Sequence, residues 1–285
     1  MYILYTFYVA CQSLEPDCLL PFYFGCSKII LVGDPKQLPP CVLSSAAQKH
    51  NLSQSLYERL EARIDRGNIS MLTRQYRMHE EICRFPNEHF YDGQLENDES
   101  VMEYWPNYPL EPYYLYNLTY TRHSCQQNGG SSHNQEERKY IKKFCITLLS
   151  TLVGRDYVKN DEEFIKMEKR IVVITPYKKQ MTKFRDRQLE FPRHIEVITV
   201  DSAQGKEKDI VLISCVRSGG TIGFLKDQRR LNVMLTRAKR ALYIFGNLSE
   251  LAEQDQHWDA LVDDAGNRGV IRTVTDSNQP VNLPF

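Results

Sequence analysis

The chain has 285 residues, enough for one large domain or two small ones. Hydrophobic residues make up 42%, so a sizeable core can form, and 36 basic residues balance 36 acidic ones. A net charge of zero excludes a global field that attracts nucleic acid, so any basic surface must be local. Basic residues gather in two stretches, Lys166–Arg187 and Lys226–Arg240.

The eight cysteines are scattered and form no C-x-x-C pair, which predicts a reducing compartment and free thiols. No stretch approaches the roughly 18 apolar residues that a membrane span requires. The first nine residues, MYILYTFYV, are apolar but lack the basic start and the small-residue cleavage site of a signal peptide. We therefore expect an intracellular protein with no membrane partner.

The first predicted strand is Lys28–Val32, which runs directly into GDPKQLPP (33–40). The double proline ends regular structure there. A simple turn would explain a lone G-D-P, but eight such residues after a strand place an acid and an amide at its carboxyl edge. Helical spacing of leucine and isoleucine then predicts a helix over Ser44–Arg66, which stops at Gly67.

The next motif is LTRQYRMH (72–79), in which Tyr76 and Arg77 are adjacent. An aromatic plane beside a fixed fork of donors suits a base and a phosphate, while a core tyrosine beside a surface arginine is the structural alternative. A helix is predicted over His79–Phe90, with Pro86 as a kink or an end.

Residues 96–132 are predicted to be irregular, and 126–134 to be a flexible loop. Interleaved aromatic side chains can stack nucleobases, but few basic residues accompany these, so ordinary packing is favoured. The aromatic residues concerned are Trp105, Tyr113, Tyr114 and Tyr116. A helix over Glu136–Val153 and a charged, solvated connector over Gly154–Lys169 follow.

Three short, β-branched runs predict buried strands at Arg170–Thr175, Ile195–Val200 and Ile210–Val216. Pro176 starts a helix at its first turn, where proline is tolerated. The acidic, basic and small residues of Asp201–Asp209 predict a tight loop between the second and third strands. Polar loops at the ends of parallel strands are where α/β sheets bind ligands.

A helix is predicted over Leu225–Lys239, followed by a strand over Ala241–Phe245. On that helix an apolar face is expected, with the arginines pointing elsewhere. The apolar residues are Leu231, Met234, Leu235 and Ala238, and the arginines are Arg229, Arg230 and Arg237. Arg229, Arg230 and Arg240 are interpreted as surface charge. From Leu248 the chain is polar and weakly patterned, and its last dozen residues are expected to form a loose tail.

From Glu136 the order is helix, strand, helix, strand, strand, helix, strand, and every strand is short and apolar. This predicts an α/β fold with a largely parallel sheet covered by helices.

Four blocks in this order carry a family resemblance: GDPKQLPP (33–40), LTRQYRMH (72–79), VITVDSAQGKEKD (197–209) and LNVMLTRAKRALYIFGN (231–247). VITPYKKQ (173–180) lies between the second and third. Together they resemble superfamily 1 helicases of the group that contains senataxin and the nonsense-mediated-decay helicase. The resemblance implies a RecA-like P-loop NTPase fold, use of ATP and Mg²⁺, and 5′-to-3′ movement on single-stranded RNA or DNA.

The resemblance also implies a domain plan: 1–66 as a remnant of the first RecA-like domain, 67–250 as the second, and 251–285 as a polar tail. A nuclear location is favoured over a cytoplasmic one. In this family ATP lies between the two domains, and the second supplies cations to its phosphates, like a finger in cis.

Individual positions match the family's functional residues. Arg77 and Arg237 match the two that touch the γ-phosphate, and Gln37 matches the one that positions the attacking water. Tyr76 matches the residue that stacks on adenine, and Glu207, in the loop with Gly205, matches one that contacts the nucleotide.

Further positions fall in blocks that grip the backbone of the single strand. These are Thr199, Asp201 and Ser202, to which Lys178 and Lys179 can add phosphate contacts. Surface lysines near a helix start are common, so solvated charge is the alternative for the two lysines.

Two family features are missing from the sequence. A P-loop needs G-x-x-x-x-G-K-[ST] after a strand, and the only Gly-Lys, Gly205-Lys206, lies in the DSAQGKEKD block. The family's Asp-Glu pair, which binds Mg²⁺, is replaced by Tyr8 and Val9, so no metal ligand is predicted. The resemblance stops at Ala10, and we expect MYILYTFYV to be unrelated sequence that leaves the strand Lys28–Val32 without neighbours, as an aggregation edge.

Two functions therefore stay open. The chain is the second half of an ATP-dependent nucleic-acid helicase, or it is a catalytically inactive half-motor that binds nucleic acid or protein. Arginine fingers contribute about 10³–10⁵ in rate, but only to a triphosphate already held with its metal.

Overall fold

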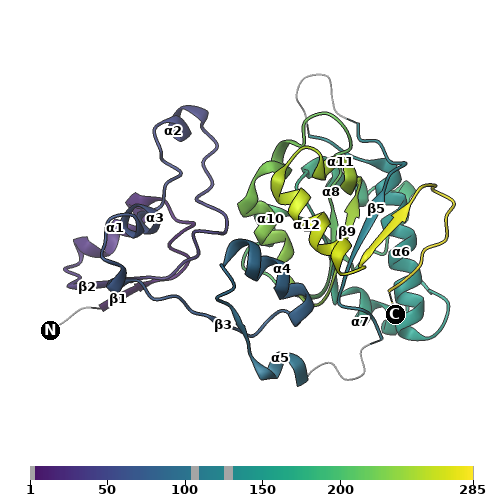
Figure 1. Cartoon of the computed structure of the whole chain (residues 1–285), viewed down its shortest axis with the longest axis horizontal. Coiled ribbons are helices and arrows are strands. Elements are labelled where there is room, and N and C mark those ends of the chain that lie inside the picture. The colour runs from purple at the N-terminus through teal and green to yellow at the C-terminus, as the bar shows by residue number, and fades with distance from the viewer. Residues whose placement is uncertain (1–3, 104–108, 125–130, 285) are drawn as a thin grey trace. The chain divides into compact units, whose positions relative to one another are not determined.

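The computed structural model describes residues 4–103, 109–124 and 131–284 (Figure 1). Trp105 and most of the predicted loop 126–134 lie outside the described residues. The chain divides into two compact units, Met1–Leu72 and Thr73–Phe285, named here the small unit and the large unit. No helix of the described residues is long and apolar enough to cross a bilayer.

The small unit contains a two-stranded parallel sheet, in which Leu4 pairs with Lys28 and Phe7 with Leu31. The prediction that the strand after Ser27 stands without a neighbour is therefore wrong, because the MYILYTFYV stretch supplies one. The elements are β1 (Leu4–Phe7), α1 (Glu15–Tyr23), β2 (Lys28–Leu31), α2 (Ser45–Lys49), α3 (Leu56–Glu61) and the 3₁₀ turn η1 (Arg66–Asn68).

The single helix predicted over Ser44–Arg66 is wrong in extent, since it is two short helices, α2 and α3. Ser44 caps α2, and Ser55 caps α3 in a reciprocal capping box with Glu58. A serine that accepts hydrogen bonds from the amides after it starts a helix rather than continuing one, which explains the break.

The large unit is built on a six-stranded sheet in the order β10-β5-β9-β8-β6-β7, and every neighbouring pair is parallel. This confirms the predicted α/β class. Its strands are β5 (Tyr113–Leu118), β6 (Ile171–Thr175), β7 (Glu196–Thr199), β8 (Lys208–Ser214), β9 (Ala238–Gly246) and β10 (Ile271–Val274). A separate two-stranded pair joins β3 (Arg74–Gln75) to β4 (Glu96–Asn97).

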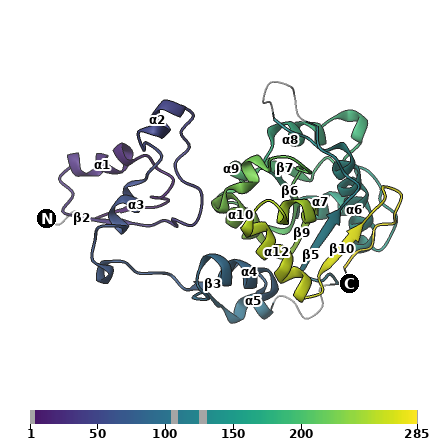
Figure 2. The same cartoon turned by 45° about the horizontal axis from the view of Figure 1, so that its top comes forward.

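Helices lie against both faces of the six-stranded sheet (Figures 1 and 2). The helices of the large unit are α4 (Glu80–Phe90), α5 (Glu99–Glu103), α6 (Gln135–Val153), α7 (Glu162–Glu168), α8 (Lys178–Phe184), α9 (Val200–Ala203), α10 (Gln228–Leu235), α11 (Leu248–Ala252) and α12 (Gln256–Asn267), of which α5 lies away from the sheet. Two 3₁₀ turns, η2 (Arg187–Leu189) and η3 (Gly223–Lys226), complete the unit.

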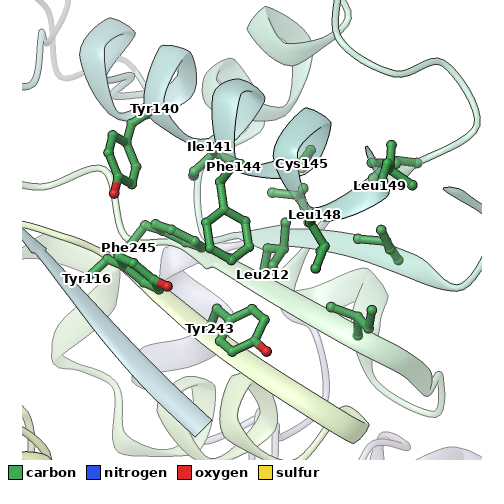
Figure 3. Packing of buried hydrophobic residues seen from close by; sticks show 14 of the residues in the cluster. Tyr116, Tyr140, Ile141, Phe144, Cys145, Leu148, Leu149, Leu212, Tyr243 and Phe245 are labelled. Atoms are coloured by element: carbon green, nitrogen blue, oxygen red, sulfur yellow. The ribbon is translucent and has the colours of Figure 1, made fainter. Parts of the chain in front are cut away.

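An aromatic cluster fills the core between α6 and the sheet (Figure 3). The rings of Tyr116 and Phe245 stack with their centroids 4.9 Å apart, and Phe144 meets Phe245 edge-on at 5.0 Å. The prediction that Tyr113, Tyr114 and Tyr116 lie in irregular chain is wrong, because they form the buried strand β5. Their packing is the ordinary packing favoured from the sequence.

Other predicted boundaries also change. Pro86 lies inside α4 and does not end it, and the connector Gly154–Lys169 contains α7, whose Phe164 is buried. The helix predicted over Leu225–Lys239 is shorter, since α10 ends at Leu235 and Ala238 already starts β9.

The segment 251–285 is structured, so its prediction as a polar tail is wrong. Strand β10 pairs with β5, and Trp258 of α12 is fully buried and donates its indole N–H to the carbonyl of Leu225 at 2.9 Å. Even after β10, the carbonyl of Asn282 accepts the hydroxyl of Tyr116 at 2.9 Å. In α12 the buried residues are Trp258, Leu261 and Ala265, and these three among polar neighbours are too few to predict a helix from the sequence pattern.

A buried carboxyl group joins α6 to the end of β8. Glu137 is 0% exposed, and it accepts hydrogen bonds from the Ser214 hydroxyl and from the Val216 amide, at 3.1 Å and 3.0 Å to its two oxygens. Val216 has a φ of +72°, a strained value for a β-branched residue. Burial raises the pKa of Glu137 to about 8.

We expect the burial of α12 to contribute strongly to stability. Trp258→Ala should lower the free energy of unfolding by about 3–5 kcal/mol, because it leaves a cavity in the core. Gln256→Ala, at an exposed position of the same helix, should change it by no more than about 0.5 kcal/mol. Urea unfolding followed by circular dichroism measures both, and equal small losses would show that α12 is not part of the folded core.

The buried Glu137 carboxyl group predicts a pH dependence. Between about 4.5, where the side chain titrates when unfolded, and about 8, the folded state keeps a proton that the unfolded state releases. The unfolding free energy of the wild type should therefore fall relative to Glu137→Gln as pH rises through this window, by at most about 1.4 kcal/mol per unit. A difference between the two proteins that stays constant from pH 4.5 to 8 would contradict this.

Candidate functional site

The QYRM turn before α4 is organised by the amide of Gln75. Its oxygen accepts the backbone amides of Arg77 at 2.9 Å and Met78 at 2.8 Å, and its nitrogen donates to the Met78 carbonyl. The His79 amide donates to the carbonyl of Lys239 at 2.9 Å, which fixes the turn against the start of β9. Tyr76 stays 66% exposed within this turn.

Arg77 joins three distant segments of the large unit. Its Nε donates to Glu207 Oε2 at 2.8 Å, and its Nη1 donates to the carbonyl of Thr236 at 3.1 Å. On the other side of the carboxylate, Lys239 Nζ lies 2.6 Å from Glu207 Oε1. One carboxylate therefore lies between two cations.

The charges around Glu207 change its acidity. Hydrogen bonds from Lys239 and then from Arg77 hold the pKa of Glu207 below its ordinary value. The carboxylate stays ionised at neutral pH, and its single negative charge offsets one of the two positive charges. A phosphate group that approaches Arg77 and Lys239 must compete with this carboxylate.

Arg237 lies beside this group but is 3% exposed. Its Nε donates to the carbonyl of Val233 at 3.0 Å and its Nη2 to the Thr236 hydroxyl at 2.8 Å, so it satisfies the carboxyl end of α10. The prediction that Arg237 points away from the apolar side is therefore wrong. Arg237 and Glu207 line one small pocket, together with Ile198 and Ala203.

The loop after α9 depends on Gly205, which has a φ of +75°. This left-handed conformation is open to glycine and strained for other residues, and it turns the chain from α9 toward β8. Glu207 follows two residues later, so the turn delivers its carboxylate to Arg77.

The residues predicted to touch a nucleic-acid backbone lie at the carboxyl ends of β6 and β7. Thr199 and Ser202 cap the short helix α9 with each other, their hydroxyl oxygens 2.9 Å apart. The Asp201 carboxylate is half exposed and pairs with Arg230 at 3.1 Å. Lys178 is exposed at the start of α8, and the backbone amide of Lys179 donates to the Ser131 hydroxyl at 3.1 Å.

Gln37 belongs to the small unit, where its amide donates to Asp34 Oδ2 at 2.6 Å. Asp34 also accepts the Lys36 amide, so the GDPKQ segment is a closed turn after β2. Gly33 in this segment has no room for a side chain, because a Cβ atom would lie 2.6 Å from the Cys11 sulfur.

The strand end that matches the family's acidic pair carries no carboxylate in the described part of the small unit. Tyr8 and Val9 follow β1 with exposed side chains and bring no carboxylate to the strand end. Within the described ranges, no group of three or more His, Cys, Asp or Glu residues is placed to hold a metal ion. The residues present therefore do not fit Mg²⁺.

Sequence reasoning missed two members of this site. Lys239 follows the LTRA residues (235–238) directly, and that position beside Arg237 is its signal in the sequence. The interpretation of Arg230 as surface charge gives no sign of its partners, which are Asp201 at 3.1 Å and Asp227 at 2.7 Å. Only the fold shows that α10 lies beside α9.

Two family models match the chain, both described as an AAA domain, over residues 52–249 and 10–45. The human protein named "Probable helicase senataxin" is 37% identical over 284 residues, which cover 94% of this chain and 10% of that protein. "Helicase sen1" of Schizosaccharomyces pombe is 38% identical over 276 residues, which cover 93% of this chain and 16% of the other. The chain thus spans a small part of the length of these relatives.

Among solved structures, that of the PRRSV helicase aligns with 87% of this chain and 36% of its own, at a TM-score of 0.43 and 16% identity. A likeness at that level carries no inference about the fold.

The Glu207 carboxylate should weaken anion binding at Arg77 and Lys239. Glu207→Gln should therefore tighten binding of inorganic tripolyphosphate by about threefold to tenfold, since each half-exposed ion pair contributes at most about 1 kcal/mol. Isothermal titration calorimetry of the full chain measures this.

Glu163→Gln is the matched control, because Glu163 also pairs with a cation, Arg155, at 3.4 Å, lies outside the pocket that Glu207 lines, and its loss changes the net charge equally. An equal gain in tripolyphosphate affinity in both variants would show that only the net charge of the protein matters. No gain in affinity in Glu207→Gln would contradict competition between Glu207 and the anion at Arg77.

Proposed function

Because this chain belongs to the superfamily 1 helicases of the group that contains senataxin, we propose that its large unit is the second RecA-like domain of a nucleic-acid helicase. The observation that carries the proposal is the contact set of Arg77. It joins the 72–79 block to the 197–209 block through Glu207 and to the 231–247 block through Thr236. Segments that resemble helicase motifs thus meet at one cationic group.

We assign Arg77 and Arg237 to the phosphates of a nucleotide, Tyr76 to its base, and Glu207 with Gly205 to the loop that contacts it. The exposed ring of Tyr76 and the adjacent cations support this division of roles. Lys239 is added as a third cation at the same group. Gln37 is assigned to the attacking water on the resemblance alone.

Hydrolysis needs a group that holds the triphosphate, and this sequence contains no P-loop string. Tyr8 and Val9 do not fit Mg²⁺. We therefore propose that this polypeptide alone binds single-stranded nucleic acid without turning over ATP. The alternative is a catalytically inactive half-motor that binds nucleic acid or protein, and it rests on the same two features, the missing P-loop string and the replacement of the acidic pair by Tyr8 and Val9.

The carboxyl edge of β6 and β7 is the proposed nucleic-acid contact. Lys178 is exposed there, while Thr199, Asp201 and Ser202 lie at the end of the neighbouring strand. Because lysines that neutralise phosphates release counterions, binding at this edge must weaken as salt rises. Lys178 and Lys179 are the residues whose loss should change that dependence.

We also propose a location inside the cell, in the nucleus rather than the cytoplasm.

Fluorescence anisotropy of a labelled single-stranded RNA measured over a salt series tests the proposal. Lys178→Ala should weaken binding and reduce the slope of log K against log salt by about 0.7, the value for one phosphate contact on a single strand. Lys159→Ala, an exposed lysine of the connector before α7, should leave both quantities unchanged. Identical slopes in all three proteins would contradict contact at the start of α8.

A further inference from the structure

One exposed aromatic side chain has no role in the site described so far. In the described part of the large unit, large apolar side chains that are exposed are Tyr76, Val158 and Phe224. Tyr76 is already assigned, and Val158 lies in the connector before α7. Phe224 is 55% exposed and lies in the 3₁₀ turn η3, between β8 and α10.

The turn that carries Phe224 is fixed on both sides by buried aromatic residues. The Tyr177 hydroxyl donates to the carbonyl of Ile222 at 3.1 Å, and the Trp258 indole donates to the carbonyl of Leu225 at 2.9 Å. Ile222 and Leu225 are themselves buried. Phe224 is therefore held outward by an anchored backbone.

Gly223 makes the approach of this turn to its support possible. Its φ is +57°, and a Cβ atom there would lie 3.1 Å from both Arg217 Nη2 and the Tyr177 hydroxyl. Any side chain at this position would press on both groups. The sequence therefore places glycine directly before the exposed ring.

Aromatic rings and guanidinium groups form a continuous row through Phe224. The centroid of its ring lies 5.8 Å from that of Tyr177 and 5.3 Å from the guanidinium of Arg230. Arg217 lies over the other ring, 5.3 Å from the centroid of Tyr177. Such distances are typical of aromatic and cation–π pairs, so the row is preorganised.

This row lies between the two parts of the proposed nucleic-acid edge. Tyr177 directly precedes Lys178, and Arg230 pairs with Asp201 at 3.1 Å. A single ring among cations does not suit an apolar protein partner, which would need a contiguous apolar patch. It suits a ligand that alternates flat π faces with negative charges.

We propose that Phe224 is a stacking platform for a nucleobase of a single strand, with Arg217 and Arg230 beside the adjoining phosphates. Stacking on a phenyl ring is tolerant of base and sugar, so RNA and DNA are both accommodated. The proposal rests on the proposed function, because it places one nucleotide of the strand that this unit is proposed to bind.

The test compares Phe224→Leu with the wild type on a base-bearing single strand and on the same strand with abasic sites. Leucine keeps an apolar side chain of similar size but has no π face. We expect Phe224→Leu to weaken binding of the base-bearing strand by about fivefold to a hundredfold, the range for one stacked base. On the abasic strand the two proteins should bind equally.

Three controls accompany this comparison in the anisotropy assay. Phe224→Tyr should restore binding, Val158→Ala should leave it unchanged, and RNA and DNA strands should lose affinity by a similar factor. Since Phe224 is exposed, Phe224→Leu should unfold at the wild-type temperature, so lost binding would not reflect lost structure.

The outcomes separate this proposal from the function on which it rests. If strands bind with a salt dependence that Lys178→Ala reduces, but Phe224→Leu binds like the wild type, only the platform is overturned. An equal loss on base-bearing and abasic strands overturns it too, because stacking is then not the contact. A wild-type chain that binds no single strand overturns both.

Discussion

The large unit depends on the double hydrogen bond of Arg77, to the Glu207 carboxylate and to the Thr236 carbonyl. These contacts bring together the turn before α4, the loop after α9 and the end of α10. Arg77 and Glu207 are 130 residues apart in the sequence. The parallel sheet makes this possible, because it places the starts of β8 and β9 side by side, with Lys208 opposite Ala238, so that Glu207 and Thr236 lie within reach of one side chain. Glu207 also pairs with Lys239, so the group is assembled by its own ion pairs and keeps one net positive charge.

The sequence predicted the buried strands β6, β7 and β8 and the long helix α6, because each has strong periodicity or a β-branched run. It did not predict β5, because the pattern around its tyrosines indicates irregular chain. It also did not predict α12 and β10, in which Trp258 and Val274 are surrounded by polar residues. These elements are stabilised by tertiary contacts, namely pairing of β10 with β5 and the bond from Trp258 to the Leu225 carbonyl. No local pattern contains such information.

The same distinction holds for the site. Motif blocks indicated Arg77, Glu207 and Arg237 by resemblance, but the burial of Arg237 against the end of α10 required the fold. The partners of Lys239 and Arg230, which are Glu207 and Asp201, follow from the fold and not from the sequence. The small unit adds a physical limit, since β1 supplies a strand beside β2 but ends in Tyr8 and Val9 rather than in carboxylates. The described residues thus bring cations together at Glu207, but place no carboxylate pair directly after β1.

The measurement that tests this account most directly is phosphate release from ATP by the purified chain in the presence of saturating single-stranded RNA, beside Arg237→Ala. Binding of the RNA is followed in the same samples by anisotropy. The account predicts bound RNA with no phosphate release above that of Arg237→Ala. Phosphate release that RNA stimulates and Arg237→Ala abolishes would contradict it, because another segment of this chain would then hold the triphosphate.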